Sequence, residues 1–295
     1  MFLQRTIREK AVVEGIGLHT GKPARLTFCP APEGTGIAFV RRDLPGEPYL
    51  SPQVESVQAT SMATTLGGDD FSVSTVEHCL SALAAFRVDN LIIELDGPEI
   101  PIGDGSAKVF LDALLKAGFA EQNEPRDYAY VTEPIFEGDQ DKHAYVMPYS
   151  GLRVSATIDF PHPAIGRQSM DLEITEQSFT REIAGARTFG FLKEVEYLRS
   201  KGLALGGSLD NAVVLDDKGV MNPEGLRWAD EFVRHKILDA LGDLVTLGAP
   251  LMGHVVLHRA GHDLMNKLVK RILDTPNSFR KIELGAALNR EPYTV

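Results

Sequence analysis

The sequence contains very little cysteine. Cys29 and Cys79 are the only two among its 295 residues. Two cysteines cannot build a disulfide framework, and they cannot supply a four-cysteine zinc site. So few thiols are typical of a protein from a reducing compartment. Residues 1–20 also lack the apolar core of a secretory signal, so we expect a cytoplasmic protein.

Long apolar runs and an excess of basic residues are missing as well. The longest weakly polar run, near residues 79–86, is far too short to span a bilayer. The chain carries 30 Lys and Arg against 41 Asp and Glu, a net charge of −11. Surfaces that track nucleic acids need a basic footprint. We therefore expect no transmembrane segment and no nucleic-acid partner, although a few local Lys or Arg could still hold a small anionic ligand.

Alternating residues and turn signals predict an α+β protein. A chain of 295 residues is long enough for two domains. The polar, non-periodic residues 118–128 mark the expected boundary, so the predicted domains cover 1–122 and 123–295. We expect the two domains to be similar, each a mainly antiparallel sheet layered with two helices, with the helical layers facing each other.

Individual elements are expected from hydrophobic periodicity and from the positions of Gly, Pro and Asn. The expected strands are 25–29, 37–40, 88–95, 129–137, 143–148, 152–160, 170–174, 212–215 and 254–258, with a hairpin formed by 61–66 and 72–74. The expected helices are 75–86, 107–117, 226–247 and 262–273. An insertion with its own short helix is expected near 191–208.

The stretch 226–247 supports the first prediction of a site. It contains no Pro, a single Gly at Gly242 and many helix formers, which predicts one long helix. His235 and Asp239 are four residues apart on it, so their side chains lie one above the other and can share a metal ion. The alternative is the solvated face of an amphipathic helix. A catalytic metal site also needs a third protein ligand.

Glu77 and His78 are candidates for the missing partner. His78 can supply the third ligand while Glu77 acts as general base, because neighbouring residues on a helix diverge by about 100°. The alternative for Glu77 is a capping box with Ser74 that stabilises the helix start. His262 opens the last expected helix, and Asp243 is a candidate acidic partner for it. The alternative for His262 is a surface position at a turn.

Two Gly-bounded segments have weaker signals. Gly103-Asp104-Gly105-Ser106 resembles a phosphate cradle, but a turn followed by a helix N-cap explains each of its residues. The hydroxyl of Thr188, within residues 186–190, could serve an oxyanion, or it could cap a turn.

Taken together, these segments resemble the UDP-3-O-acyl-N-acetylglucosamine deacetylases, zinc amidases that commit Gram-negative bacteria to lipid A synthesis. The resemblance covers nearly the whole chain. The segments that carry it are Gly15-Ile-Gly-Leu-His-Thr-Gly21, Thr75-Val-Glu-His78, Pro101-Ile-Gly-Asp-Gly-Ser-Ala107, Ala186-Arg-Thr-Phe-Gly190, Leu205-Gly-Gly-Ser208, Arg234-His-Lys-Ile-Leu-Asp239 and Gly261-His262.

The resemblance implies a zinc ion, a set of roles and a substrate. The implied ligands are His78, His235 and Asp239, with water in the fourth position. The implied catalytic residues are Glu77 as general base, His262 as general acid, Asp243 to orient His262 and Thr188 as oxyanion donor. The implied substrate contacts are His19, Met62, Phe160, Phe189, Phe191 and Lys236. An apolar passage in the insertion would hold the acyl chain, and the substrate UDP-3-O-acyl-N-acetylglucosamine would yield acetate and the free amine.

Two other functions remain open at this point. The same three ligands could serve another zinc amidase or a peptidase, which would need an open cleft with strand-pairing edges. A non-catalytic module with a structural zinc would need a fourth Cys or His ligand, and none is evident near the three. We expect the protein to be a monomer.

Overall fold

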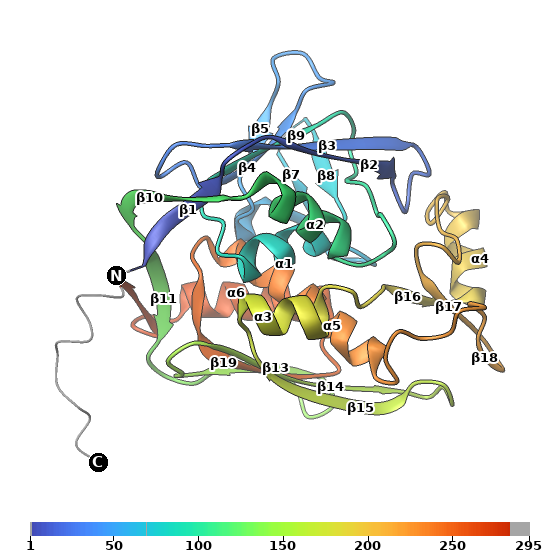
Figure 1. The fold of residues 1–295 in the computed structure, drawn as a ribbon. Helices are drawn as coiled ribbons and strands as arrows, with labels where there is room; N and C mark the ends of the chain where they lie inside the picture. The colour runs from blue at the N-terminus through green and yellow to red at the C-terminus, as the bar shows by residue number, and fades with distance from the viewer. Residues whose placement is uncertain (1, 69, 284–295) are drawn as a thin grey trace.

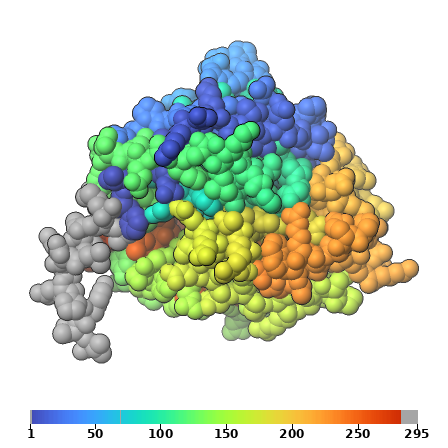
Figure 2. Space-filling model, in the orientation of Figure 1, coloured from blue at the N-terminus to red at the C-terminus, as the bar shows by residue number. Residues whose placement is uncertain are grey.

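Two β-sheets enclose a double layer of helices (Figure 1). The computed structural model describes residues 2–68 and 70–283, while residues 1, 69 and 284–295 lie outside the described part. The predicted α+β class is confirmed, and so are the helical layers that face each other. In the space-filling view, blue and blue-green atoms of the N-terminal half lie over yellow and orange atoms of the C-terminal half (Figure 2).

The N-terminal half is built on a sheet with the strand order β2-β3-β9-β4-β5. Its strands are β2 (Ala11–Ile16), β3 (Pro23–Pro30), β9 (Leu91–Leu95), β4 (Ile37–Arg41) and β5 (Tyr49–Leu50). In β3, Leu26 and Phe28 are buried while Arg25 between Ala24 and Leu26 is exposed, the period-two pattern of a sheet with one covered face. Helices α1 (Glu77–Ala85) and α2 (Lys108–Ala117) cover that face.

The C-terminal half has a larger, mixed sheet. Strand β19 (Leu251–His258) is central, and it pairs with β13, β14 and β11. The other strands are β11 (Asp127–Val131), β12 (Ile135–Gly138), β13 (His143–Met147), β14 (Leu152–Phe160), β15 (Gly166–Glu173) and β20 (Phe279–Glu283). Helices α5 (Glu231–Leu244) and α6 (His262–Asp274) cover the inner face, and the short α3 (Glu176–Ser178) leads into a π-helical turn over Phe179–Ile183.

Each half carries an insertion beside the helical layers. In the N-terminal half, a 3₁₀ turn (Val54–Ser56) precedes the antiparallel strands β6 (Val57–Ala59), β7 (Thr65–Gly67) and β8 (Ser72–Ser74), which confirms the predicted hairpin. In the C-terminal half, the insertion comprises β16 (Phe189–Phe191), α4 (Leu192–Ser200), β17 (Val213–Asp216) and β18 (Gly219–Val220). The short helix expected there is therefore present.

Three sequence-based expectations were wrong in their details. The stretch 118–128, described from the sequence as polar and non-periodic, contains strand β10 (Phe119–Pro125), which pairs with β1 (Leu3–Ile7). The strand expected over 129–137 is two strands, interrupted before Ile135 by Pro134, which lacks a backbone donor. The long helix begins at Glu231 rather than at residue 226, and it ends at Leu244 in a 3₁₀ turn over Val245–Leu247. At the start of this helix, the Glu231 carboxylate accepts a hydrogen bond from the Arg227 backbone N–H at 2.6 Å. This bond ties the preceding segment to the first turn.

Helix α5 is buried on nearly all sides. Its apolar residues Val233, Ile237 and Leu241 are buried, and so are the polar residues His235 and Asp239. The alternative of a solvated polar face is therefore wrong for this helix. Within the described residues, none of the helices combines the length and apolar character needed to cross a membrane.

The crossing of α1 over α5 is closest at Gly242. A Cβ atom added to Gly242 would lie 2.1 Å from the backbone oxygen of Glu77, a distance that no pair of non-bonded atoms can adopt. The one glycine of α5 therefore lets the two helices meet backbone to backbone at the residue that precedes His78.

Replacing Gly242 with Ala should destabilise the protein, although Gly→Ala inside a helix normally stabilises by about 1 kcal/mol. The added methyl group forces the two helices apart, and overpacking of this kind costs about 1–3 kcal/mol. We expect a lower free energy of unfolding in chemical denaturation. Gly97→Ala is the control, because a Cβ there meets no atom within 4 Å. Unchanged or higher stability of Gly242→Ala would contradict the close crossing.

Candidate metal centre and active site

One cavity between the helical layers gathers most of the predicted site residues. It has a volume of about 790 Å³ and extends from the α1–α5 crossing to the insertion of the C-terminal half. The predicted residues that line it are His19, Met62, Glu77, His78, Phe160, Thr188, Phe189, His235, Lys236, Asp239 and His262. Asp243 lies behind His262, with a carboxylate oxygen 2.8 Å from the His262 Nδ1 atom.

Side chains from both halves converge at one end of this cavity. His78 comes from α1, while His235 and Asp239 lie one turn apart on α5. The Oδ1 atom of Asp239 is 3.2 Å from the Nε2 atom of His235 and 3.7 Å from the Nε2 atom of His78. The three ligand atoms lie within 4.8 Å of one another, and all three residues are buried. The geometry is that of a three-ligand metal site.

The hydrogen-bonding roles of these atoms favour a cation between them. His235 Nδ1 lies 2.9 Å from the carbonyl oxygen of Ala186. A carbonyl can only accept, so Nδ1 carries a proton, and Nε2 presents a lone pair whenever the imidazole is in its neutral form. Asp239 Oδ1, which faces that lone pair, is buried and has no hydrogen-bond partner among the described residues. Two acceptor atoms that face each other are stabilised by a cation, and a divalent metal ion fits this donor set.

Burial and neighbouring charges keep these side chains in the forms that bind metals. Burial, followed by the proximity of His235, lowers the pKa of His78 to about 3, so the imidazole is neutral near pH 7. Burial opposes ionisation of Asp239, but nearby positive charge, including the Lys236 ammonium 2.7 Å from Oδ2, outweighs it and holds the pKa of this carboxyl well below its usual value. A neutral imidazole and a carboxylate are the species that coordinate divalent metals.

A second pair of groups, Glu77 and His262, lies beside the three ligands. The Nε2 atom of His262 is 3.8 Å from Oε1 of Glu77. Burial raises the pKa of Glu77 to about 7. Burial acts against the charged form of His262, but the charge and hydrogen bond of Asp243 outweigh it and raise its pKa to about 10. Near neutral pH the pair therefore combines a carboxyl group that readily exchanges a proton with an imidazolium that can donate one.

The comparison with known proteins agrees with this geometry. Residues 4–274 match the family described as UDP-3-O-acyl N-acetylglycosamine deacetylase. The chain belongs to this family. A UDP-3-O-acyl-N-acetylglucosamine deacetylase of Bdellovibrio bacteriovorus is 66% identical over 291 residues, which cover 99% of this chain and 96% of the relative. Relatives of the same name from Oleidesulfovibrio alaskensis and Myxococcus xanthus are 51% and 48% identical; they cover 98% of this chain and 95% and 91% of their own lengths.

Thr64 is the residue at this deacetylase site that sequence reasoning missed. Its backbone N–H donates to Oε2 of Glu77 at 3.1 Å, and its hydroxyl donates to Oδ1 of Asp243 at 2.6 Å. Thr64 therefore holds the carboxylates of two different helices. The capping box expected for Glu77 and Ser74 is wrong, because α1 starts after Val76 with no side-chain cap. The Glu77 carboxylate turns instead toward Thr64 and the cavity.

His19 lies on a loop that bridges the two halves of the family fold. Its backbone N–H donates to Oε1 of the buried Glu99 at 2.8 Å, and its carbonyl accepts from the Leu205 N–H at 3.1 Å. Both ring nitrogens are buried and have no hydrogen-bond partner among the described residues. Burial lowers the pKa of this imidazole. The ring is therefore free to hydrogen-bond a ligand in the cavity.

Three of the predicted aromatic contacts form a cluster. The Phe160 and Phe189 rings line the cavity and meet edge to face, with centroids 5.6 Å apart. Phe191 lies behind them, 6.0 Å from Phe160 and 5.4 Å from His162, and it is not among the described residues that line the cavity. If Phe191 contributes to substrate binding, it does so by supporting Phe160.

Two further predicted contacts, Lys236 and Met62, also line the cavity. The ammonium of Lys236 is 2.7 Å from Oδ2 of Asp239 and 5.5 Å from the centroid of the Phe189 ring. Met62 lines the cavity with 51% of its surface exposed and with a left-handed backbone, φ 67°. Lys236 is thus held next to the ligands, whereas Met62 lies at the rim.

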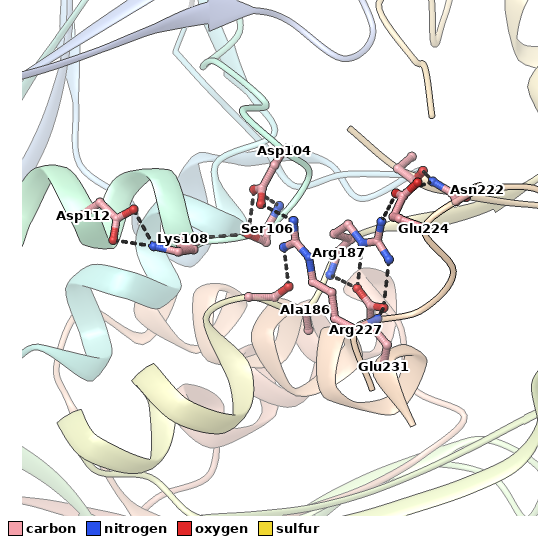
Figure 3. A network of polar contacts seen from close by, with 12 residues as sticks. Asp104, Ser106, Lys108, Asp112, Ala186, Arg187, Asn222, Glu224, Arg227 and Glu231 are labelled. Atoms are coloured by element: carbon pink, nitrogen blue, oxygen red, sulfur yellow. Dashed lines mark hydrogen bonds and ion pairs between the residues drawn. The ribbon is translucent and has the colours of Figure 1, made fainter. Parts of the chain in front are cut away.

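The segment 103–106 is a packing turn. Asp104 Oδ1 accepts from the N–H and the hydroxyl of Ser106, and Asp104 Oδ2 pairs with Arg227 at 2.8 Å (Figure 3). Gly105 has φ +85°, and its carbonyl accepts from the Thr188 N–H at 2.7 Å. A turn therefore explains this motif, which supports the backbone of Thr188 in the cavity wall. The helix N-cap expected at Ser106 is wrong, because the N-cap of α2 (Lys108–Ala117) is Ala107, with no side-chain cap.

Replacing Asp243 with Asn should lower the pKa of His262 by about 1–3 pH units, because the imidazolium loses its nearest carboxylate while it stays buried. An NMR titration of the metal-free protein measures this pKa. Asp263→Asn is the control, since Asp263 is exposed and pairs with Lys267. An equal pKa in Asp243→Asn and wild type would show that Asp243 does not stabilise the imidazolium.

Proposed function

We propose that this chain is a zinc-dependent deacetylase that hydrolyses the N-acetyl group of UDP-3-O-(3-hydroxyacyl)-N-acetylglucosamine. The products are acetate and the free amine, and the reaction is the committed step of lipid A synthesis. The observation that carries the proposal is the meeting of His78 with His235 and Asp239 beside Glu77 and His262 in one cavity. The names of relatives that are 48–66% identical support the choice of substrate.

His78, His235 and Asp239 would hold the zinc ion. Three protein ligands leave one coordination position open, which is the arrangement of catalytic rather than structural zinc sites. When bound, zinc supplies a Lewis acid that activates water and polarises the amide carbonyl.

Two side chains, Glu77 and His262, would transfer protons in the reaction. Glu77 accepts the proton of the attacking water, for which a pKa of about 7 is well matched near neutral pH. His262 donates a proton to the departing nitrogen, because an amide nitrogen leaves poorly without one. Asp243 keeps His262 oriented and charged through its bond to Nδ1. The Thr188 hydroxyl in the cavity wall donates to the oxyanion, an interaction typically worth about 3 kcal/mol.

The rest of the cavity suits an amphipathic substrate. Apolar side chains of the C-terminal insertion and its surroundings line the part away from the ligands: Leu192, Val195, Leu198, Leu209, Ala212, Val214 and Met221. They would form the passage for the acyl chain, within the insertion 191–208 and the strands that follow it. Lys236, His19, Phe160 and Phe189 would contact the sugar and its diphosphate. We further propose domains of 1–122 and 123–295, a monomer and a cytoplasmic location.

The direct test is acetate release from UDP-3-O-acyl-N-acetylglucosamine by the zinc-loaded protein, with Glu77→Ala as the comparison. We expect Glu77→Ala to lower kcat by about 10²–10⁴-fold, because it removes the general base, while bound zinc measured by elemental analysis stays near one per chain. Near wild-type turnover of this variant would refute the role of Glu77.

Asp239→Ala provides the contrasting variant. It leaves two imidazoles, which hold a divalent ion poorly, so we expect loss of both zinc and activity after dialysis. Full zinc occupancy of Asp239→Ala would count against Asp239 as a ligand. Absence of acetate release by the zinc-loaded wild type would refute the proposed reaction.

A further inference from the structure

A single peptide group connects the proposed ligand His235 to a buried carboxylate. The carbonyl of Ala186 accepts from His235 Nδ1 at 2.9 Å. The N–H of Arg187, in the same planar peptide, donates to Oε1 of Glu231 at 3.1 Å. Glu231 and His235 are i and i+4 on α5, so they lie on one side of the helix. The peptide 186–187 therefore bridges two successive turns of α5.

Glu231 is held by several donors and is fully buried. Its exposed fraction is 0%, and that of Arg187 is 2%. The Arg187 guanidinium donates to Oε1 at 2.9 Å and to Oε2 at 3.2 Å, and the Arg227 backbone N–H donates to Oε2 at 2.6 Å (Figure 3). Arg187 also donates to Glu224 and to the Gly225 carbonyl. These bonds fix the position of the Glu231 carboxyl group.

We propose that Glu231 is a positioning residue for His235, acting on the imidazole through the Ala186–Arg187 peptide. This inference rests on the proposed role of His235 as a metal ligand. Metal-binding histidines commonly donate their second ring N–H to a carboxylate or a carbonyl, which fixes the tautomer and raises the basicity of the ligating nitrogen. Here the Glu231 carboxylate accepts from the N–H of the peptide whose carbonyl accepts from His235. Because hydrogen bonds in a chain strengthen one another, Glu231 makes the Ala186 carbonyl a stronger acceptor.

The arrangement has two consequences at the cavity. It keeps the proton on Nδ1 and turns the Nε2 lone pair toward Asp239. It also fixes the segment that continues into Thr188, whose own N–H is held by Gly105. The alternative explanation is the helix dipole, which favours a negative charge at Glu231, the first residue of α5. It would not account for the bond from Glu231 to the Arg187 N–H, which is the contact that reaches His235.

Glu231→Gln tests the inference, because it keeps the size of the side chain and removes its charge. We expect the dissociation constant for zinc, measured by competition with a chromophoric chelator, to rise by about 10- to 100-fold. In the metal-free protein, the imidazole ¹⁵N shifts of His235 should move from a pure Nδ1–H form toward a mixture of tautomers.

Asp89→Asn is the matched control. Asp89 is a partly buried carboxylate that likewise accepts from a backbone N–H, that of Arg5 at 2.9 Å, and from an arginine, Arg126, at 2.7 Å. We expect it to lose stability while zinc affinity and the His235 shifts stay unchanged. Arg187→Lys is the second control. It disturbs the ion pair but leaves the hydrogen bond from the backbone N–H of residue 187 to Glu231, so zinc affinity should stay within about threefold of wild type.

The possible results separate this inference from the proposed function. A wild-type protein that binds no zinc overturns the proposed function. Equal zinc affinity and equal His235 shifts in Glu231→Gln and wild type overturn the role of Glu231 only. Equal weakening by Glu231→Gln and Arg187→Lys also overturns it, because the effect would then be general destabilisation. If Glu231→Gln does not fold, the wild-type spectrum decides: an Nε2–H tautomer of metal-free His235 contradicts the inference.

Discussion

The backbone contact between α1 and α5 at Gly242 is the constraint on which the arrangement of the site depends. His78 and Glu77 belong to one half of the chain, and His235 and Asp239 to the other. The structure brings them to a common point where the two helices meet backbone to backbone, closer than helices with ordinary side chains at the contact. Gly242 permits that approach, with Glu77 directly against it. The two sheets cover the outer sides of the helical layers.

Close approach of the halves also creates an electrostatic problem, because it buries several ionisable groups together. Glu77, Asp239 and Asp243 are all buried between the layers. Unpaired, such charges would be strongly unfavourable. Here Asp243 is compensated by His262 and Thr64, and Asp239 by Lys236. The remaining acceptor atoms point toward one place, which is where a divalent cation would complete the compensation.

Sequence reasoning selected the proposed ligands and the proposed proton-transfer pair, which line one cavity, because several of them sit in local patterns. His235 and Asp239 share a helix face by spacing alone, and Glu77 and His78 are neighbours. It missed Thr64, whose partners lie 13 and 179 residues away, and it left open a capping-box alternative for Glu77 that the structure does not contain. Contacts between distant segments depend on how the halves pack, and local spacing contains no information about that packing. The same limit hid strand β10 in a polar, non-periodic stretch, because its partner β1 lies at the other end of the half.

A zinc-edge anomalous diffraction map of crystals of the zinc-loaded protein tests most directly whether α1 and α5 meet around one ion. The expected result is one strong peak within about 2.0–2.2 Å of a nitrogen of His78, a nitrogen of His235 and an oxygen of Asp239. A peak bound to the two α5 residues but out of bonding reach of His78, or a peak elsewhere in the molecule, would contradict the shared site.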